Sequence, residues 1–459
     1  MSSDWKICML GELGTIKTGK TPASSLGDGF GGTVPFVTPG DMNGQKWITD
    51  TDRCLNERGL ASVSSSLMPP RSVAVSCIGS DMGKASLLSR PSVTNQQINT
   101  IAVDESRFNA EFVYYDLSVR QQELKAAANG SATPILNKGH FSAFEISIPP
   151  RATQDKIAEI LGKLDDRIAV NRRINQTLEA MAQAIFQSWF VDFYPVKAKI
   201  AAKAEGRDPL RAAMSAMSGK ADAELDALPP AQYEQLAATA ALFPDELVDS
   251  ELGKMPKRWH SSTLGEHCAY LNRGISPKYI DEGGVLVLNQ KCIRDFRLDP
   301  SKARRHDPNQ RNVSGRELQQ GDVLVNSTGV GTLGRVAQVL RLDEPTIVDS
   351  HVTVVRSGPT LNSAYLGRWF VMKQADIEAM GEGSTGQTEL ARGKLVSMLI
   401  LVPDQAVLGA FADAVAPIQS LIATRDRESL VLQQTRDALL PRLLSGELQP
   451  TVALEGVDA

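Results

Sequence analysis

Hydrophobic and polar positions follow two patterns along the chain, and each pattern occurs twice. Short apolar runs bounded by Gly, Pro and Asn predict strands, for example SVAVSCI (72–78), INTIAV (98–103), DVLVNS (322–327) and HVTVVR (351–356). A helical stretch follows near 109–127 and again near 363–381. Each half then ends in an apolar strand with a proline, after which a long helix is expected. The pattern therefore predicts a compact head followed by a long helix, twice.

The two long helices show apolar positions in alternating steps of four and three, which is the heptad pattern of paired helices. The first seam is Ile157, Leu161, Leu164, Ile168, Asn171, Asn175, Leu178, Ala182, Ile185 and Trp189, and the second is Phe411, Val415, Ile418, Ile422, Arg425, Ser429, Leu432, Arg436, Leu439 and Leu443. Both seams become polar at the same place. Two ordinary amphipathic surface helices would also fit, but the matched polar positions favour mutual pairing. Helices of nearly forty residues would be roughly 55–60 Å long. Pro417 is expected to kink the second helix or to mark its start.

The two halves align at an offset close to 254 residues, from Trp5 with Trp259 onward. We expect an α+β fold with a pseudo-twofold internal repeat, in which two similar α/β heads are separated by two long helices that pair as an antiparallel coiled coil. The expected boundaries are 1–150 for the first head, 151–193 for the central helix, 194–255 for a partly helical connector, 256–403 for the second head and 404–448 for the C-terminal helix. Such a chain suits a near-twofold partner, and duplex DNA with two half-sites is the obvious one.

Residues 14–21 read GTIKTGKT and fit the phosphate-loop pattern G-x-x-x-x-G-K-[ST]. A phosphate loop opens a helix, whereas here Pro22 follows and disfavours helical backbone at Thr21. The second half has Gly274-Ile275-Ser276-Pro277 at this place, so it keeps the glycine and the proline without the lysine. We therefore predict a glycine–proline turn rather than a nucleotide site.

Composition narrows the class of protein further. The chain has 459 residues and a net charge of −4, so any basic surface for nucleic acid must be local or supplied by a partner. The five cysteines are scattered without C-x-x-C spacing, and the five histidines do not cluster with them. We expect no metal site, no disulfide framework, no secretion signal and no membrane helix, and hence a cytoplasmic protein.

Several phrases resemble the specificity subunits of type I restriction-modification systems. They are LGELGTIKTGKTP near the start, IPPRATQDKIAEILGKLDDRIAVNRRINQTLEAMAQAIFQSWFVDF at the first long helix, and GRDP, LFPDELVDSELGKMPKRW and LLPRLLSGEL later. The resemblance implies that each head reads one half of a bipartite DNA sequence and that the helices set the gap. It also implies docking of two methylation subunits, which use S-adenosylmethionine, and of motor-nuclease subunits, which use ATP and Mg²⁺. An orphan or decoy scaffold of the same architecture remains the alternative.

No catalytic motif is expected in this chain itself. Its Pro-Pro pairs at 69–70, 149–150 and 229–230 do not fit the [DNS]-P-P-[YFW] motif of adenine methyltransferases. Pro244-Asp245 and Glu251-Leu252-Gly253-Lys254 have the wrong spacing for a nuclease. No cofactor is therefore expected in this chain, and the resemblance implies cofactors only in the partner subunits.

Basic residues supply the candidates for DNA contact. The densest stretch is 291–316, with eight Lys or Arg against three Asp, although such a run is often only a solvated face. The DNA-binding candidates are Lys17, Lys20, Asn43, Gln45, Lys46, Arg53 and Lys84 in the first head, and Lys291, Arg294, Arg297, Arg304, Arg305 and Arg335 in the second. Arginines suit guanine edges, and Asn43 and Gln45 suit adenine. The candidates for partner binding are Trp189, Phe190, Phe193, Leu439, Leu440, Leu443 and Leu444, for which internal packing is the equal alternative.

Overall fold

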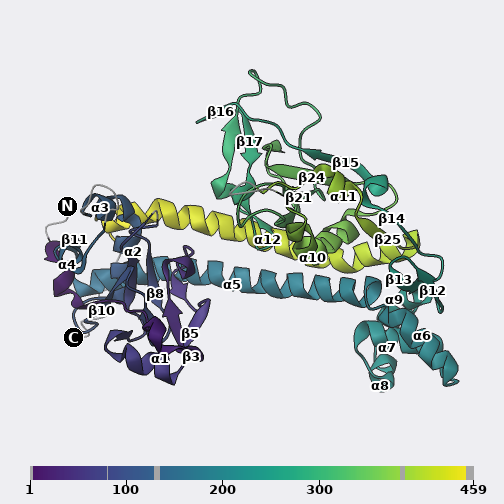
Figure 1. Ribbon diagram of the computed structural model, residues 1–459, viewed down its shortest axis with the longest axis horizontal. Helices are drawn as coiled ribbons and strands as arrows, with labels where there is room; N and C mark the ends of the chain where they lie inside the picture. The colour runs from purple at the N-terminus through teal and green to yellow at the C-terminus, as the bar shows by residue number, and fades with distance from the viewer. Residues whose placement is uncertain (1–3, 80, 129–134, 383–387, 451–459) are drawn as a thin grey trace, which may run out of the picture. The chain divides into compact units, whose positions relative to one another are not determined.

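The computed structural model describes the chain except for residues 1–3, 80, 129–134, 383–387 and 451–459 (Figure 1). The chain divides into two compact units, one made of residues 1–171 with 427–459 and the other of residues 172–426. Two long helices, α5 (Arg151–Phe190) and α12 (Gln405–Leu444), each contribute one segment to each unit. Each unit therefore holds one head and a pair of helix segments, which confirms the predicted α+β class.

The first unit contains the head built from the first eleven strands. Its strands are β1 Lys6–Met9, β2 Gly14–Thr18, β3 Phe30–Val37, β4 Trp47–Ile48, β5 Arg53–Leu55, β6 Leu67–Met68, β7 Val73–Ser76, β8 Ala85–Leu88, β9 Ser92–Thr94, β10 Ile98–Val103 and β11 Glu145–Ile148. Its helices are α1 Glu57–Ser62, α2 Ala110–Val119, α3 Gln121–Ala126 and α4 Lys138–Ser142. The strands form sheets of order β2-β10-β7-β8-β4, β5-β3-β9-β6 and β1-β11.

The core of the first unit joins this head to both long helices. Buried Phe112 and Tyr115 on α2 lie in one apolar cluster with Leu161 on α5 and Leu443 on α12. The helix segments also form ion pairs, since Arg436 on α12 bonds Asp165 on α5 at 2.7 Å. Arg167 on α5 pairs with Glu428 on α12 at 2.7 Å. Rising residue numbers on α5 meet falling numbers on α12, so the two segments run antiparallel.

The second unit contains the head built from β14 to β25, together with the connector. Its strands are β12 Leu247–Ser250, β13 Gly253–Pro256, β14 His260–Thr263, β15 Cys268–Arg273, β16 Tyr279–Ile280, β17 Val285–Leu288, β18 Ile293–Arg294, β19 Arg297–Leu298, β20 Arg304–His306, β21 Val323–Asn326, β22 Val336–Gln338, β23 Thr346–Val348, β24 Val352–Ser357 and β25 Leu399–Val402. Its helices are α6 Tyr194–Ala204, α7 Pro209–Ser218, α8 Asp222–Asp226, α9 Pro230–Ala241, α10 Ser363–Ala379 and α11 Arg392–Val396. Sheets of order β15-β24-β21-β22 and β16-β20-β17-β23 form the head, and β14-β25, β12-β13 and β18-β19 are smaller pairs.

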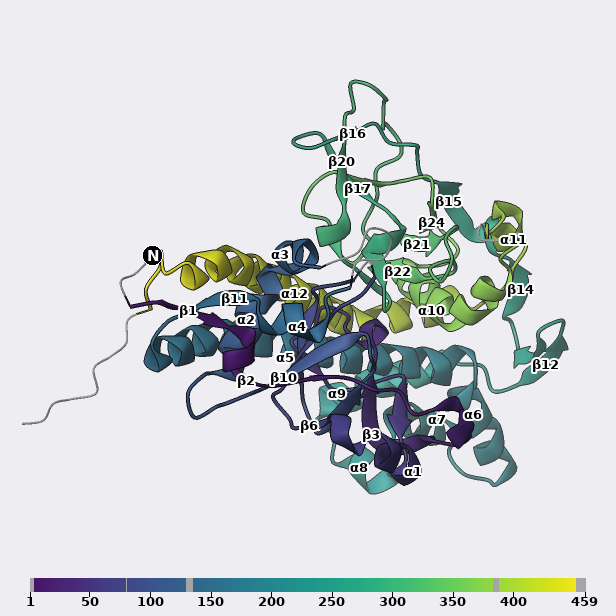
Figure 2. The same cartoon turned by 60° about the vertical axis from the view of Figure 1, so that its left-hand side comes forward.

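The connector is more helical than its prolines alone would predict, with four helices in sequence (Figure 2). Buried Met214, Leu225 and Ala240 from three of these helices form a small apolar cluster of their own. α7 and α9 begin with prolines. Proline is tolerated there because a backbone N–H at the first position of a helix has no partner within that helix. The connector therefore packs as a small helical bundle within the second unit.

The two heads repeat the same hydrogen bonds at matching places. The order β2-β10-β7-β8 of the first head corresponds to β15-β24-β21-β22 of the second. The amide of Gly19 donates to the carbonyl of Ile98 at 3.1 Å, and that of Gly274 donates to Val352 at 3.0 Å. A Cβ at Gly19 would lie 2.1 Å from the Thr94 oxygen, and one at Gly274 would lie 2.1 Å from the matching oxygen of Val348. Glycine is required at both places because a neighbouring backbone passes too closely for any side chain.

Two features of the C-terminal helix bear on what the sequence led us to expect. α12 runs from Gln405 without interruption through Pro417, so the proline does not mark its start. An 18-residue window of α12 also reaches a mean hydropathy of 1.6, which meets the length and composition test for a membrane helix. On one face of this helix, Val407, Phe411 and Val415 lie in the core of the second unit. This face of α12 is apolar because it packs against the second head.

Candidate nucleic-acid interface

In the first head, two of the predicted basic contacts are exposed and form no ion pair among the described residues. Lys20 lies just after β2, and Arg53 begins β5. The Arg53 guanidinium lies over the rings of Phe30, 4.5 Å from its centroid, and Phe36, 5.2 Å from its centroid. Asn43 and Gln45 are also exposed, in the loop before β4. These residues remain candidates for DNA contact.

Lys46 is buried, contrary to its prediction as a DNA contact. Its side chain is 5% exposed, and its Nζ lies 2.5 Å from Glu111 of α2 and 5.3 Å from the ring centroid of Tyr115. Burial would raise the pKa of Glu111, but the hydrogen bond and charge of Lys46, followed by those of Arg71, hold it below its usual value. Removing Lys46 would be costly, because it would leave the carboxylate of Glu111 unpaired. Lys46 is therefore a structural residue of this head.

Lys84 and Lys17 have partners within the first head. Lys84 Nζ lies 2.9 Å from Asp81, three residues earlier in the chain. Lys17 Nζ donates to the carbonyl of Leu67 at 3.4 Å. Both side chains are partly exposed, so these contacts reduce their availability without burying the charge.

In the second head, Arg297 is held by acidic residues of both long-helix segments of the same unit. Its guanidinium pairs with Glu179 of α5, 3.5 Å away, and with Asp426 of α12. Burial lowers the pKa of this guanidinium to about 10; Glu179 raises it and Arg368 lowers it. Buried Arg368 of α10 also pairs with Glu179. The structure thus uses Arg297 to attach the head to the helices, and its sequence-based assignment to DNA is corrected accordingly.

Arg305 and Arg335 also have partners inside the head. The Arg305 guanidinium makes two bonds to Glu344, of 2.8 and 3.0 Å, and Arg335 donates to the carbonyl of Gly331 at 2.7 Å. The pKa of Arg305 is raised by its hydrogen bond to Glu344 and by the charge of that carboxylate. An arginine already bonded bidentately offers few donors to a base.

Three of the predicted DNA contacts in the second head are exposed. Lys291 is exposed beside β18, and Arg294 lies 3.6 Å from the carboxylate of Asp295. Arg304 begins β20 and lies over the ring of Tyr279, 3.4 Å from the centroid. Sequence reasoning missed the two aromatic partners, Phe30 and Tyr279. The sequence did contain a shared feature, since each aromatic residue precedes a Gly-Gly pair that is followed by a short strand-forming stretch, in FGGTV and in YIDEGGV.

The predicted partner-binding residues lie in the cores of their own units. Trp189, Phe190 and Phe193 are 5, 4 and 9% exposed and pack in an aromatic cluster with Phe411 and Trp259. Leu440, Leu443 and Leu444 are 8, 1 and 7% exposed in the core of the first unit, and Leu439 packs partly buried against it. The alternative of internal packing is therefore the one that the structure shows, and these side chains form no open docking surface.

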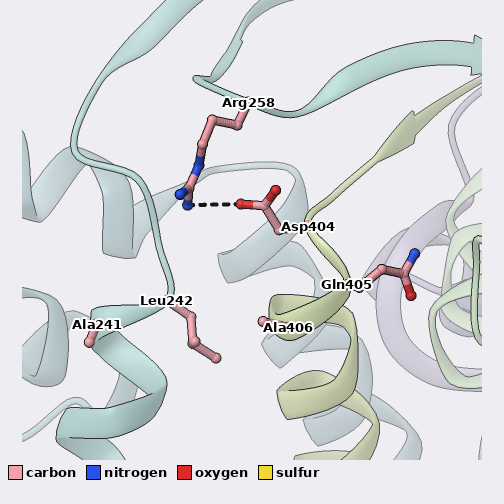
Figure 3. A pocket seen from close by; sticks show the side chains of 6 residues that line it. All are labelled: Ala241, Leu242, Arg258, Asp404, Gln405 and Ala406. Carbon is pink, nitrogen blue, oxygen red and sulfur yellow. Dashed lines mark ion pairs between the residues drawn. The ribbon is translucent and has the colours of Figure 1, made fainter.

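A surface pocket lies at the start of α12 within the second unit (Figure 3). It is lined by Ala241, Leu242, Arg258, Asp404, Gln405 and Ala406. Its two charged groups face each other, with Arg258 Nη2 2.9 Å from Asp404 Oδ2. The charges that line this pocket neutralise one another, so it offers neither an activated nucleophile nor an anion site.

The GTIKTGKT segment has no phosphate-binding geometry. Gly14–Thr18 is the edge strand β2, and the next helical element is a single three-residue 3-10 turn, Ser24–Leu26. The amides of Gly19 and Lys20 donate to carbonyls of Ile98 and Thr94 at 3.1 and 2.9 Å. A phosphate loop needs these amides free. The segment is therefore a strand followed by a turn, as predicted.

The repeated heads and the antiparallel helix segments define a class of two-headed chain built on two long helices. Residues 2–180 match the family model described as type I restriction modification DNA specificity domain. The chain is 28% identical over 345 residues to the HindI specificity subunit of Haemophilus influenzae, covering 70% of this chain and 73% of that one. It is 23% identical over 469 residues to the MjaIX specificity subunit of Methanocaldococcus jannaschii, covering 97 and 94%.

A solved structure shares the fold. The S subunit of a type I restriction-modification system from M. genitalium superposes with a TM-score of 0.51 at 15% identity, covering 99% of this chain and 98% of that chain. The sequence phrases and these comparisons agree. Residues 2–180 therefore carry a type I restriction modification DNA specificity domain, and over nearly its whole length the chain is similar to a type I restriction enzyme specificity subunit.

Proposed function

We propose that this chain reads a bipartite, asymmetric DNA target, with one half of the target assigned to each head. The observation that carries the proposal is the repeated strand order β2-β10-β7-β8 and β15-β24-β21-β22 within one chain. Two similar heads with different surface side chains suit two half-sites of different sequence. The chain itself performs no chemistry in this proposal.

The partners in this proposal are two methylation subunits and motor-nuclease subunits, assembled in the cytoplasm. S-adenosylmethionine, ATP and Mg²⁺ would be bound by those subunits and not by this chain. Partner subunits would also complete the positive surface round the DNA, since the chain has a net charge of only −4. The polar seam positions would fix the register of α5 against α12 and so the length of the unread gap.

The test is a methylome. The chain is co-expressed with the methylation subunit encoded beside it, in a host that lacks adenine methylation, and N6-methyladenine is mapped genome-wide. A bipartite motif with one fixed gap is the expected result, and exchange of residues 1–150 for those of a relative should change one half only. A stable complex that leaves the genome unmethylated would refute the proposal and favour the orphan scaffold.

A further inference from the structure

Two arginines occupy the same position in the two heads. In the first head, Phe30 and Val34 both pair with Leu55, and Arg53 lies opposite Phe36 two residues earlier. In the second head, Tyr279 and Val285 both pair with His306, and Arg304 lies opposite Val287 two residues earlier. The strand registers therefore make Arg53 equivalent to Arg304.

The same registers make Phe30 equivalent to Tyr279, and each aromatic ring lies under the arginine of its own head. The guanidinium carbon is 4.5 Å from the ring centroid in the first head and 3.4 Å in the second. The sequences around the aromatic residues differ, with three residues between Tyr279 and its Gly-Gly pair and none between Phe30 and its own pair. Both heads therefore have an exposed arginine lying over an aromatic ring, although the sequences of the strands that carry this pair differ.

These two guanidinium groups differ electrostatically from the neighbouring ones. Arg297 and Arg305 are neutralised by carboxylates of the same unit. Arg53 and Arg304 are exposed and form no ion pair among the residues that the structure describes. The ring covers part of each guanidinium, and no carboxylate among the described residues holds the N–H donors of either one.

We propose that Arg53 and Arg304 are the guanine-reading residues of the two heads, one for each half of the target, and that Phe30 and Tyr279 are positioning residues that orient them. This inference rests on the proposed function. A planar guanidinium matches the O6 and N7 acceptors of guanine in the major groove, which a lysine cannot reproduce bidentately. A ring that already restricts the side chain reduces the entropy lost when the base is bound.

The test uses the complete complex of this chain with its methylation subunits. The methylome of the wild-type complex first defines the motif. Methylation rates are then measured on duplexes that carry guanine or another base at each specified guanine. Arg53→Lys is expected to reduce the preference for one guanine in one half-site by about 5- to 150-fold, and Arg304→Lys that for one guanine in the other half-site.

The positioning role is tested by paired aromatic variants. Phe30→Leu and Tyr279→Leu should each reduce the guanine preference in the half-site of their own head. Phe30→Tyr and Tyr279→Phe keep the ring and should leave that preference at the wild-type level. Arg107→Lys is the matched control in the first head, because Arg107 stacks on Phe108, 4.9 Å from its centroid, away from β5. Arg341→Lys, at an arginine paired with Asp343 at 2.7 Å, is the control in the second head. Complex formation with the methylation subunits and thermal unfolding show that each variant is folded.

The outcomes separate the two ideas. Absence of any bipartite motif with the wild-type complex would overturn the proposed function itself. A bipartite motif whose guanine preferences survive both lysine variants would overturn only this inference. Equal weakening on all sequences, with a smaller dependence of binding on salt, would also overturn it, because that result describes a phosphate contact.

Discussion

Replacement of Gly19 by alanine tests the GKT segment more directly than replacement of its lysine. A Cβ at this position would lie 2.1 Å from the carbonyl oxygen of Thr94 and 2.2 Å from that of Asn95. Both obstacles are backbone atoms of the segment that leads into β10, so no side chain can rotate away. Since non-bonded heavy atoms settle at roughly 3.5 Å, the two backbones would have to separate by about 1.4 Å.

The cost of this separation follows from the bonds that it breaks. The hydrogen bonds from Gly19 to Ile98 and from Lys20 to Thr94, of 3.1 and 2.9 Å, would both be lost. At about 1 kcal/mol for each bond and about 1–3 kcal/mol for overpacking, Gly19→Ala should destabilise the first head by ~3–5 kcal/mol. Lys20 is exposed, so Lys20→Ala should change stability by less than about 0.5 kcal/mol.

Hydrogen exchange of the full chain is the assay, because two units need not unfold in one transition. Protection of the peptides that cover β2 and β10 should fall sharply in Gly19→Ala. Gly40→Ala is the control, since a Cβ there would meet only the Thr38 Oγ1, at 3.5 Å. The reasoning is refuted if β2 and β10 are as well protected from exchange in the Gly19→Ala variant as in the Gly40→Ala variant. It is also refuted if the wild-type chain binds ATP and Lys20→Ala removes that affinity.

Three further predictions concern buried charge, acid stability and turn strain. Glu179→Gln should destabilise the second unit by about 3–5 kcal/mol in chemical unfolding, because it leaves Arg368, which is 3% exposed, without its carboxylate; a cost below about 1 kcal/mol would contradict this. The pKa of Glu111 is lowered in the folded chain because Lys46 outweighs the effect of burial. The stability that the ionised Glu111 contributes is therefore complete above the unfolded pKa of about 4.3, and it is lost as the pH falls through the folded pKa. The melting temperature of the Glu111→Gln variant should accordingly change less between pH 6 and pH 3 than that of the wild type. Phe296 has a φ of 60°, so Phe296→Gly should stabilise the β18–β19 hairpin by about 1 kcal/mol, and a loss of stability would show that its ring packs.

Much of the fold could be predicted because local patterns determine it. The apolar runs predicted at 98–103 and 351–356 correspond to β10 and β24, and the stretch near 363–381 corresponds to α10. The stretch near 109–127 contains a break that periodicity does not reveal, because Arg120 ends α2 and bonds back to buried Asp116 at 2.7 Å. Periodicity records which face is apolar and not where a side chain interrupts the backbone.

The candidate surface was predicted less well because the partners of charged residues lie far away in the sequence. Lys46 and its carboxylate are 65 residues apart, and Arg297 and Glu179 are 118 apart. A basic stretch therefore contains both neutralised and free arginines, and composition treats them alike. Aromatic residues at the end of a helix were similarly ambiguous, since Trp189 could have served an interface and instead fills a core.

The polar positions of the two seams acquire a physical meaning from the division into units. The boundary between the units falls after Asn171 in α5 and after Asp426 in α12, within the polar part of both heptad patterns. On either side of it the seam residues belong to the core of a head, as Leu161 does in the first unit and Phe411 in the second. At the boundary itself, buried Asn171 has no hydrogen-bond partner for either polar atom among the described residues. Such a residue costs stability in either core, and a polar residue inside a heptad seam generally fixes the register of the paired helices at that cost.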